Sequence, residues 1–273
     1  MRGIIMNCEV IAEIGWNHMG DMVLAKEMIA SAAEAGADYV KFQTWSTNKL
    51  KQGAWNNDGR YEIYKKAELS QEQHVELSDY CQTNSIKFLT SIFNENDVSW
   101  LSELCGDAIK VPSHEVYNKN LISKLDAKFE KVFISTGAST WDEVSRLNNL
   151  VKNSTLYLLH CVSSYPCPPE NVNLPRIAAL KELCENVGYS GHFFGIDDAI
   201  AAISYDLRII EKHFTLDRSL PGRDNQYAIL PNELKQICDY RDNFSQMQIK
   251  HGNEYQKCEQ DIIENYRGRW SKT

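Results

Sequence analysis

Short apolar runs alternate with longer amphipathic runs along the whole chain. Most of the apolar runs are continuous or nearly continuous, which is typical of parallel strands that are covered on both faces. The pattern predicts eight strands, at residues 8–14, 39–44, 87–93, 108–112, 131–136, 155–161, 187–190 and 208–215.

The amphipathic runs predict a helix after every strand. In residues 21–36, Leu24, Met28 and Ala32 recur at helical spacing, and Gly36 is a typical helix stop. The predicted helices are residues 21–36, 71–84, 96–105, 118–128, 140–153, 173–185, 197–206 and 231–250.

Eight strand–helix units in this length predict an α/β fold, a closed (β/α)8 TIM barrel formed as a single domain. An open doubly wound sheet is the weaker alternative, because no GxGxxG motif follows the first strand. We expect the barrel to occupy residues 1–250, and residues 251–273 to form a polar tail or an interface arm. The longest connection, residues 45–70, is expected to be a lid or a binding loop, with a surface insertion as the alternative.

The composition indicates a globular protein and argues against some classes of binding partner. The 273 residues are 43% hydrophobic and 24% charged, as is typical of a globular protein with a sizeable core. Lys and Arg number 29 against 37 Asp and Glu, so the formal charge is -8, and neither nucleic acid nor an anionic membrane is expected as a partner. Eight cysteines without a CxxC pair are typical of scattered thiols in a reducing cytoplasm.

Polar side chains stand at the C-terminal end of nearly every predicted strand, where a barrel carries its active site. One such residue is most often a loop-capping group, but buried charges need partners, so the whole set is expected to converge. Lys41 and Gln43 alternate along the second strand and share a face, which we expect to be the barrel interior. The set includes Glu13, Lys41, Gln43, Ser91, Lys110, Ser113, Glu115, Ser135, Ser163, Tyr165, Ser190, His192, Glu211, His213 and Asp224.

Two kinds of chemistry suit these residues. Lys41 and Lys110, together with several serine hydroxyls and the Ser135-Thr136-Gly137 turn, favour binding of a phosphate or a carboxylate. Either lysine could instead form a Schiff base with a keto acid, as in lyase barrels.

His192 and His213 follow neighbouring strands, so they can hold one divalent metal and leave positions for water and substrate. Two unrelated histidines are the alternative. Glu13 and Glu115 are available for acid–base work or for binding sugar hydroxyls.

The chain resembles the sialic acid (N-acetylneuraminate) synthases, a group that also makes legionaminic and pseudaminic acids, over almost the whole barrel. The resemblance implies condensation of phosphoenolpyruvate with an N-acylated hexosamine, such as N-acetylmannosamine, to a nine-carbon keto sugar acid and phosphate. It also implies a divalent metal that polarises the open-chain aldehyde, manganese foremost, with magnesium and cobalt as alternatives. The matching motifs are IAEIGWNHMGD (11–21), AGADYVKFQT (35–44), YEIYKKAELS (61–70), ISTGAST (134–140), LLHCVSSYPCP (158–168), GYSGH (188–192) and EKHFTLDRSLPGRD (211–224).

By motif position, the resemblance implies a role for each candidate. Glu13 is implied to act as an acid or base or to position water, and His192 and His213 are implied to be the metal ligands. The residues implied for the phosphoenolpyruvate pocket are Lys41, Ser91, Lys110, Ser113, Ser135, Ser163 and Ser190, of which Lys41 and Lys110 also count as catalytic. The residues implied for the sugar are Gln43, Glu115, Tyr165 and Asp224. A homodimer is the family expectation.

Four departures from the family pattern accompany the resemblance. The antifreeze-like domain that usually follows the barrel is not expected here. The mouth is therefore expected either to be more open or to be closed by a separate capping subunit or by residues 45–70. Gly191 stands where the family has Asp, and Ser163 stands where it has Asn. The fourth departure is a Pro112-Ser113-His114-Glu115 run in place of Gly-Ser-Gly-Glu.

Two other functions stay open beside the synthase. One is a catalytically silent barrel that binds a sugar or phosphoenolpyruvate, or that supports a partner subunit. The other is a lysine-dependent pyruvate lyase. The choice of acceptor sugar, of metal and of oligomeric state also stays open at this point.

Overall fold

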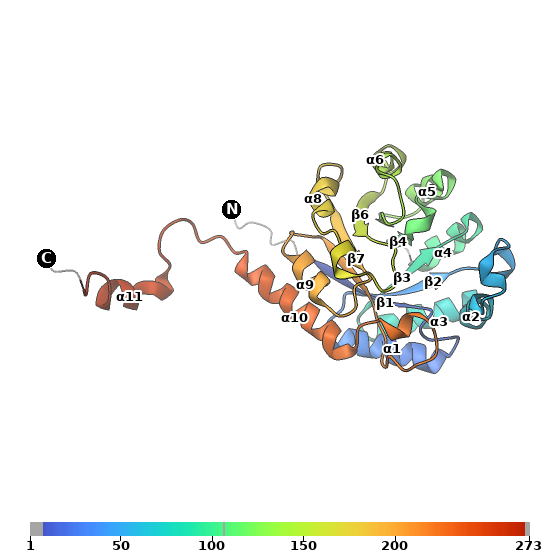
Figure 1. The fold of residues 1–273 in the computed structure, drawn as a ribbon, viewed down its shortest axis with the longest axis horizontal. Coiled ribbons are helices and arrows are strands. Elements are labelled where there is room, and N and C mark those ends of the chain that lie inside the picture. Colours follow the sequence, from blue (N-terminus) through green and yellow to red (C-terminus); the bar gives the residue numbers. More distant parts are fainter. Residues whose placement is uncertain (1–7, 106, 271–273) are drawn as a thin grey trace.

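The computed structural model describes residues 8–105 and 107–270, and in it eight parallel strands close into a barrel (Figure 1). Each strand pairs with its neighbour in sequence order, and β8 pairs with β1 to complete the ring. The strands are β1 (Glu9–Gly15), β2 (Tyr39–Thr44), β3 (Lys87–Ile92), β4 (Ala108–Val111), β5 (Lys131–Ser135), β6 (Thr155–Cys161), β7 (Val187–Gly191) and β8 (Ile209–His213). The predicted (β/α)8 barrel is therefore confirmed.

Helices surround the barrel, except α11, which lies in the C-terminal segment away from it (Figure 1). They are α1 (Met22–Glu34), α2 (Arg60–Ala67), α3 (Gln71–Thr83), α4 (Val98–Cys105), α5 (Lys119–Asp126), α6 (Trp141–Ser145), α7 (Leu147–Leu150), α8 (Arg176–Lys181), α9 (Asp197–Ile203), α10 (Pro231–Met247) and α11 (Gln260–Asn265). Among the described residues, no helix is both long and apolar enough to cross a membrane.

Two predicted helices differ from those observed. The helix expected at 140–153 is divided into α6 and α7, where the Ser145 hydroxyl donates to the Trp141 carbonyl at 2.7 Å and competes with the backbone ladder. The helix expected at 173–185 is shortened to α8, because Asn173 has a left-handed backbone (φ +52°) and Pro175 has no N–H to donate.

The barrel interior has an apolar floor. Along each strand alternate side chains face inward, and the lower inward positions pack against one another without charge. This floor consists of Ile11, Tyr39, Leu89, Ala108, Phe133, Leu159 and Ile209. The next inward position toward the C-terminal end of each strand is polar or a thiol on most of them, so the mouth of the barrel is lined with polar groups.

The connection at residues 45–70, expected as a loop, contains a helix. Its helix α2 packs Tyr64 against Trp16 and Trp45, with ring centroids 5.0 and 5.5 Å apart. The helix itself is strongly polar, and Ala67 is its one fully buried residue, so its stability comes from this tertiary contact more than from its own sequence.

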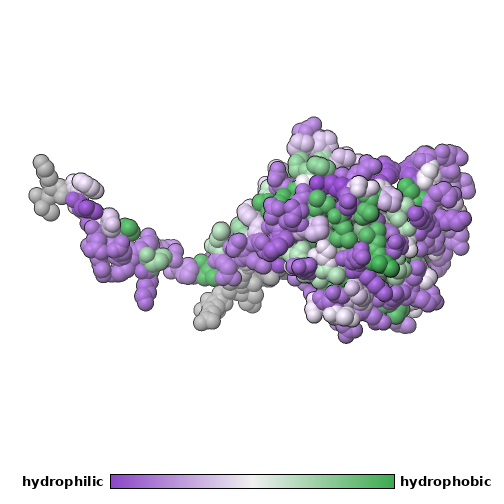
Figure 2. Space-filling view, turned by 90° about the horizontal axis from the view of Figure 1, so that it is seen from below, coloured by the Kyte–Doolittle hydropathy of each residue, from purple (hydrophilic) through white to green (hydrophobic). Residues whose placement is uncertain are grey.

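The C-terminal segment leaves the barrel after α10 and includes α11 (Figure 1). Ile263 is half-buried and every other residue from 246 to 270 is exposed. Figure 2 shows this segment extending away from the body of the molecule with a largely hydrophilic surface. All eight cysteines are unpaired, six of them buried, with Cys184 half-buried and Cys258 exposed.

Candidate functional site

Charged side chains meet inside the mouth of the barrel. Glu13 of β1 lies beside Lys41 of β2 on one side and His213 of β8 on the other in the strand register. Glu211 of β8 lies beside Ser190 of β7. The polar positions predicted on separate strands are thus brought together because the sheet closes.

Lys41 is held by a carboxylate and a hydroxyl. Its Nζ lies 2.7 Å from Glu13 Oε2 and donates to Ser91 Oγ at 2.8 Å. Gln43 Nε2 donates to the other Glu13 oxygen at 2.6 Å, so Lys41 and Gln43 do share the inner face. Both ions of the pair are about as buried as the apolar floor below them, with 3% and 2% of their side chains exposed.

Burial controls the ionisation of Glu13. It raises the pKa of this carboxyl to about 7, although the nearby Lys41 opposes the shift. A carboxyl with this pKa exchanges its proton near neutral pH, which suits a general acid or base.

A second ion pair, Lys110 with Glu211, lies near the first, and the sequence predicted no role for Glu211. Lys110 Nζ donates to Ser135 Oγ at 2.6 Å and lies 3.6 Å from Glu211 Oε1. The same Glu211 oxygen accepts from Ser190 Oγ at 2.8 Å, and Glu211 Oε2 lies 3.9 Å from Lys41 Nζ. Glu211 therefore stands between the two lysines. The available signal was its place two residues before His213, on the same face of β8.

Burial acts on the members of this second pair in different ways. Burial lowers the pKa of Lys110, and Glu211 opposes that shift. Burial alone would raise the pKa of Glu211, but Lys110 and Lys41 lower it below its usual range. Glu211 therefore stays ionised near neutral pH.

A glycine turn adjoins the lysine pair. The backbone N–H of Gly137 donates to Ser113 Oγ at 3.1 Å. A Cβ atom on Gly137 would lie 2.9 Å from Ser113 Oγ, 3.0 Å from Cys161 Sγ and closer still to Ser163 Oγ. Ser113 and Ser163, predicted from different strands, thus face the same glycine, and the close approach requires that it has no side chain.

His192 and His213 face each other across the mouth with ring centroids 5.3 Å apart. His192 Nδ1 donates to the Val162 carbonyl at 2.9 Å. Burial opposes the charged form of this ring, but the nearby Cys161 raises the pKa of His192 above its ordinary value. His213 Nδ1 is buried without a hydrogen bond and lies 3.5 Å from Asp224 Oδ2. Burial and the neighbouring His192 hold the pKa of His213 well below its usual value, so this imidazole is neutral.

Two imidazoles that face each other suit a divalent metal once His192 has lost its proton, because only an unprotonated ring nitrogen is a ligand. The described residues contain no group of three or more His, Cys, Asp or Glu side chains placed to hold one ion. The donor set that fits a metal is therefore the histidine pair, and any remaining ligands would be water or substrate.

Aromatic and acidic groups border the histidines. Tyr165 lies over His192 with ring centroids 4.1 Å apart, and Tyr227 lies 5.4 Å from His213. Burial raises the pKa of Asp224, while the nearby polar groups of Tyr227 and Trp16 oppose the shift.

Glu115 is the candidate that the described contacts do not join to the others. It accepts from Asn118 Nδ2 at 3.1 Å, within its own loop after β4. Its predicted role at the sugar stays a prediction.

Gly191, which precedes His192, has no room for a side chain. A Cβ atom here would overlap the Asp198 carboxylate and lie 2.5 Å from the Tyr189 ring. The Asp198 carboxylate of α9 therefore occupies the space that the aspartate of the family pattern would need at this position.

Comparison with known proteins agrees with this architecture. The NeuB family model matches residues 28–253. The chain is 37% identical over 246 residues to N,N'-diacetyllegionaminic acid synthase of Campylobacter jejuni, covering 84% of this chain and 74% of that protein. It is 34% identical over 244 residues to human N-acetylneuraminate-9-phosphate synthase, covering 84% of this chain and 68% of the human protein.

A solved structure shares the whole barrel. The N-acetylneuraminic acid (sialic acid) synthetase of Leptospira borgpetersenii, in complex with citrate, superposes with a TM-score of 0.86 at 30% identity, covering 98% of this chain and 94% of that one. A matching family model, similar sequences and a shared barrel lead to one conclusion: this chain belongs to the NeuB family of synthase enzymes.

Proposed function

We propose that this protein is a metal-dependent synthase that condenses phosphoenolpyruvate with an N-acylated hexosamine of the N-acetylmannosamine type. The products are a nonulosonic (sialic-type) acid and phosphate. One observation carries the proposal: two buried lysines with serine partners and a facing histidine pair occupy the same barrel mouth. Relatives named as legionaminic acid and N-acetylneuraminate-9-phosphate synthases support the class of product.

The lysines supply the anion site. Lys41 and Lys110 are each neutralised by a carboxylate in the structure, Glu13 and Glu211 respectively. An incoming phosphate and carboxylate would take over these lysines and their serine partners, and protonation of Glu13 would offset part of the added negative charge.

The histidines supply the metal site. His192 and His213 would hold a divalent ion, for which we propose manganese, with magnesium and cobalt as alternatives. When bound, the ion would polarise the aldehyde oxygen of the open-chain sugar.

The reaction balances with water as the third reactant. A bond would form between C3 of phosphoenolpyruvate and the aldehyde carbon, and the aldehyde oxygen would take up the proton that Glu13 carries when the anion is bound. Water would then add at C2 and give one proton back to Glu13, which exchanges its proton near neutral pH. Cleavage of the bond from C2 to the phosphate oxygen would leave the keto acid, and the second proton of the water would leave with the phosphate.

The sugar would lie above the anion, toward the rim. Tyr165 and Asp224 contact the histidines, and Gln43 is bonded to Glu13 at the end of β2. We propose that they bind the acceptor, that Glu115 joins them when the sugar is present, and that the enzyme works as a cytoplasmic homodimer.

The test is phosphate release by the purified chain from phosphoenolpyruvate and N-acetylmannosamine with Mn²⁺, beside a chelator control. A panel of related hexosamines would rank the acceptors. We expect chelator-sensitive release that falls at least about 100-fold in Glu13→Gln and in His213→Ala. His251→Ala, a substitution of an exposed histidine, is the matched control and should release phosphate at the wild-type rate.

Each alternative has its own outcome. Phosphoenolpyruvate binding without release, with any sugar of the panel, would overturn the synthase and favour a silent barrel. A covalent pyruvate adduct trapped by borohydride on Lys41 or Lys110 would favour the lyase. Full activity of His213→Ala would overturn the metal assignment.

A further inference from the structure

Lys212 occupies the outer face of β8, between the inward-facing Glu211 and His213. Its neighbours on that outer face, Ile210 and Phe214, are apolar and fully buried. A lysine in this layer between strands and helices has no water to solvate its charge, so it requires partners within the protein.

The partners form a complete set. Lys212 Nζ lies 2.9 Å from both carboxylate oxygens of Asp198 and donates to the Phe193 carbonyl at 2.8 Å. Tyr189 donates its hydroxyl to Asp198 Oδ2 at 2.8 Å. The Lys212 and Asp198 side chains are 3% and 2% exposed. We call these three side chains, Lys212, Asp198 and Tyr189, the clamp.

The clamp joins the segments that carry both histidines. Lys212 immediately precedes His213, and the Phe193 carbonyl that it binds immediately follows His192. The Asp198 carboxylate also lies against Gly191, on the other side of His192. A single buried cation therefore comes from the residue before His213 and binds the carbonyl of the residue after His192.

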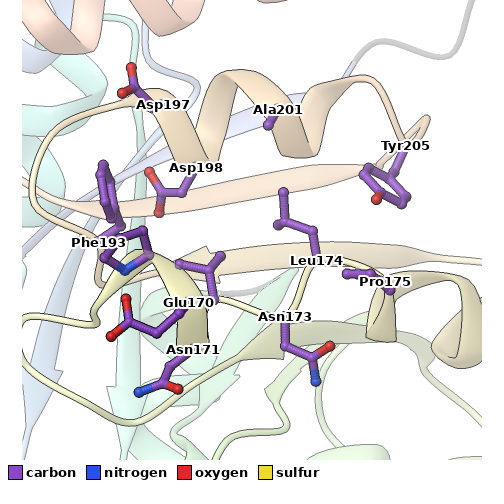
Figure 3. A pocket seen from close by; sticks show the side chains of 12 residues that line it. Glu170, Asn171, Asn173, Leu174, Pro175, Phe193, Asp197, Asp198, Ala201 and Tyr205 are labelled. Carbon is purple, nitrogen blue, oxygen red and sulfur yellow. The ribbon is translucent and has the colours of Figure 1, made fainter.

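Backbone hydrogen bonds also hold this corner. The Cys167 N–H donates to the His192 carbonyl at 2.8 Å, and the Ile229 N–H donates to the His213 carbonyl at 2.7 Å. A cleft of about 930 Å³ lies between α9 and the segment that precedes α8 (Figure 3). Asp198 and Phe193 both line it, and Figure 3 shows Asp198 projecting from α9 on the side of the cleft where Phe193 lies. The backbone hydrogen bonds hold the main chain at each histidine separately, whereas the clamp connects the residue before His213 directly to the residue after His192.

A gain in folding stability does not by itself explain why this buried ion pair is present. Replacing a buried ion pair with apolar residues of similar volume is often neutral or stabilising. Its place beside the two rings suggests a different role.

We propose that the clamp is a positioning device that sets the distance and orientation of His192 relative to His213 for a shared divalent ion. This rests on the proposed metal role of the two histidines. Loss of the clamp would loosen the histidine pair but leave the lysine-lined anion site in place, since Lys41 and Lys110 are held from β1, β3, β5 and β8.

The test compares metal and anion affinity in Lys212→Met. Mn²⁺ affinity is measured from the electron paramagnetic resonance signal of the free ion, and phosphoenolpyruvate affinity is measured by calorimetry in metal-free buffer. We expect Mn²⁺ to bind about 10- to 100-fold more weakly, as is usual when a group that orients metal ligands is removed. Phosphoenolpyruvate affinity should stay within about twofold of wild type.

Two further variants keep the result interpretable. Tyr189→Phe keeps the ring and removes one hydrogen bond to Asp198, so it should fold and weaken Mn²⁺ binding about threefold. Arg241→Met breaks a different ion pair, that of Arg241 with Asp38. It should lower the melting temperature without changing Mn²⁺ affinity.

The outcomes separate the clamp from the proposed function. Wild-type Mn²⁺ affinity in both Lys212→Met and Tyr189→Phe would overturn the clamp and leave the metal assignment standing. An equal loss of Mn²⁺ affinity in Arg241→Met would show that general destabilisation of the protein explains the loss, and this would also overturn the clamp. Absence of Mn²⁺ binding in the wild-type protein would overturn the metal assignment and the clamp together.

Discussion

At the scale of single residues, Glu13 would couple its own protonation to anion binding at the proposed phosphoenolpyruvate site. It shares Lys41 at 2.7 Å, and burial raises its pKa to about 7. Below that pH the carboxyl is neutral and Lys41 is available to an anion. Above it the carboxylate competes for the same ammonium group.

The affinity for phosphoenolpyruvate should therefore fall as the pH rises above 7. The loss should approach about tenfold per pH unit, the limit for uptake of one proton. Calorimetric titrations between pH 6 and pH 9 in metal-free buffer would measure it. In Glu13→Gln this dependence should disappear, and an unchanged slope in that variant would assign it to another group.

Gly137 is the second residue for which we predict the effect of a substitution. In Gly137→Ala the new methyl group would meet Ser113 Oγ, Cys161 Sγ and Ser163 Oγ. We expect a loss of about 1–3 kcal/mol in the free energy of unfolding, typical of overpacking, and weaker phosphoenolpyruvate binding because Ser113 is displaced. Urea unfolding and calorimetry would measure the two effects, and wild-type values of both would show that the turn has room to move.

At the scale of elements, an aromatic cluster packs the connection at residues 45–70 against the barrel mouth. The cluster consists of Trp16, Trp45, Tyr64 and Phe93. The Trp45 ring lies 6.0–6.1 Å from those of Phe93 and Trp16, and it is 6% exposed. The helix α2 buries little besides this contact, so the cluster decides whether residues 45–70 stay folded.

We expect Trp45→Ala to release this connection. The barrel should keep its far-ultraviolet circular dichroism, because its own core is untouched, while brief proteolysis of the native protein should cut within residues 45–70. Mass spectrometry would locate the cuts. Trp141→Ala, at a site that is 44% exposed, is the matched control and should stay resistant. Equal resistance of both variants would show that the connection is held elsewhere.

At the scale of the whole molecule, the barrel divides its interior between stability and chemistry. The lower layer is apolar, whereas the layer above holds two lysines and two glutamates in a mutual network. Each ion has a partner, which limits the cost of burial. The described part of the C-terminal segment contributes to neither layer.

Removal of residues 251–273 should leave the barrel intact. The described part of this segment is exposed at almost every position, so we expect the melting temperature to change by less than about 2 °C. Differential scanning calorimetry would measure it. A drop of 5 °C or more would mean that the segment packs against a second copy in solution, and light scattering would then detect the change in mass.

The sequence by itself determined the succession of elements and the inward positions. Apolar runs and helical spacing are local signals, so the eight strands were located to within two residues at each end. Alternation along a strand likewise placed Lys41 and Gln43 on one face. The resemblance named the family, and the comparisons confirmed it.

Only the tertiary structure decided which polar groups meet. The position of Glu211 between two lysines depends on barrel closure and register, which no local pattern contains. The clamp of Lys212 with Asp198 joins a strand to a helix, and α2 exists because of contacts outside itself. Periodicity depends on neighbours along the chain, whereas ion pairing depends on neighbours in space, and these are set when the barrel closes.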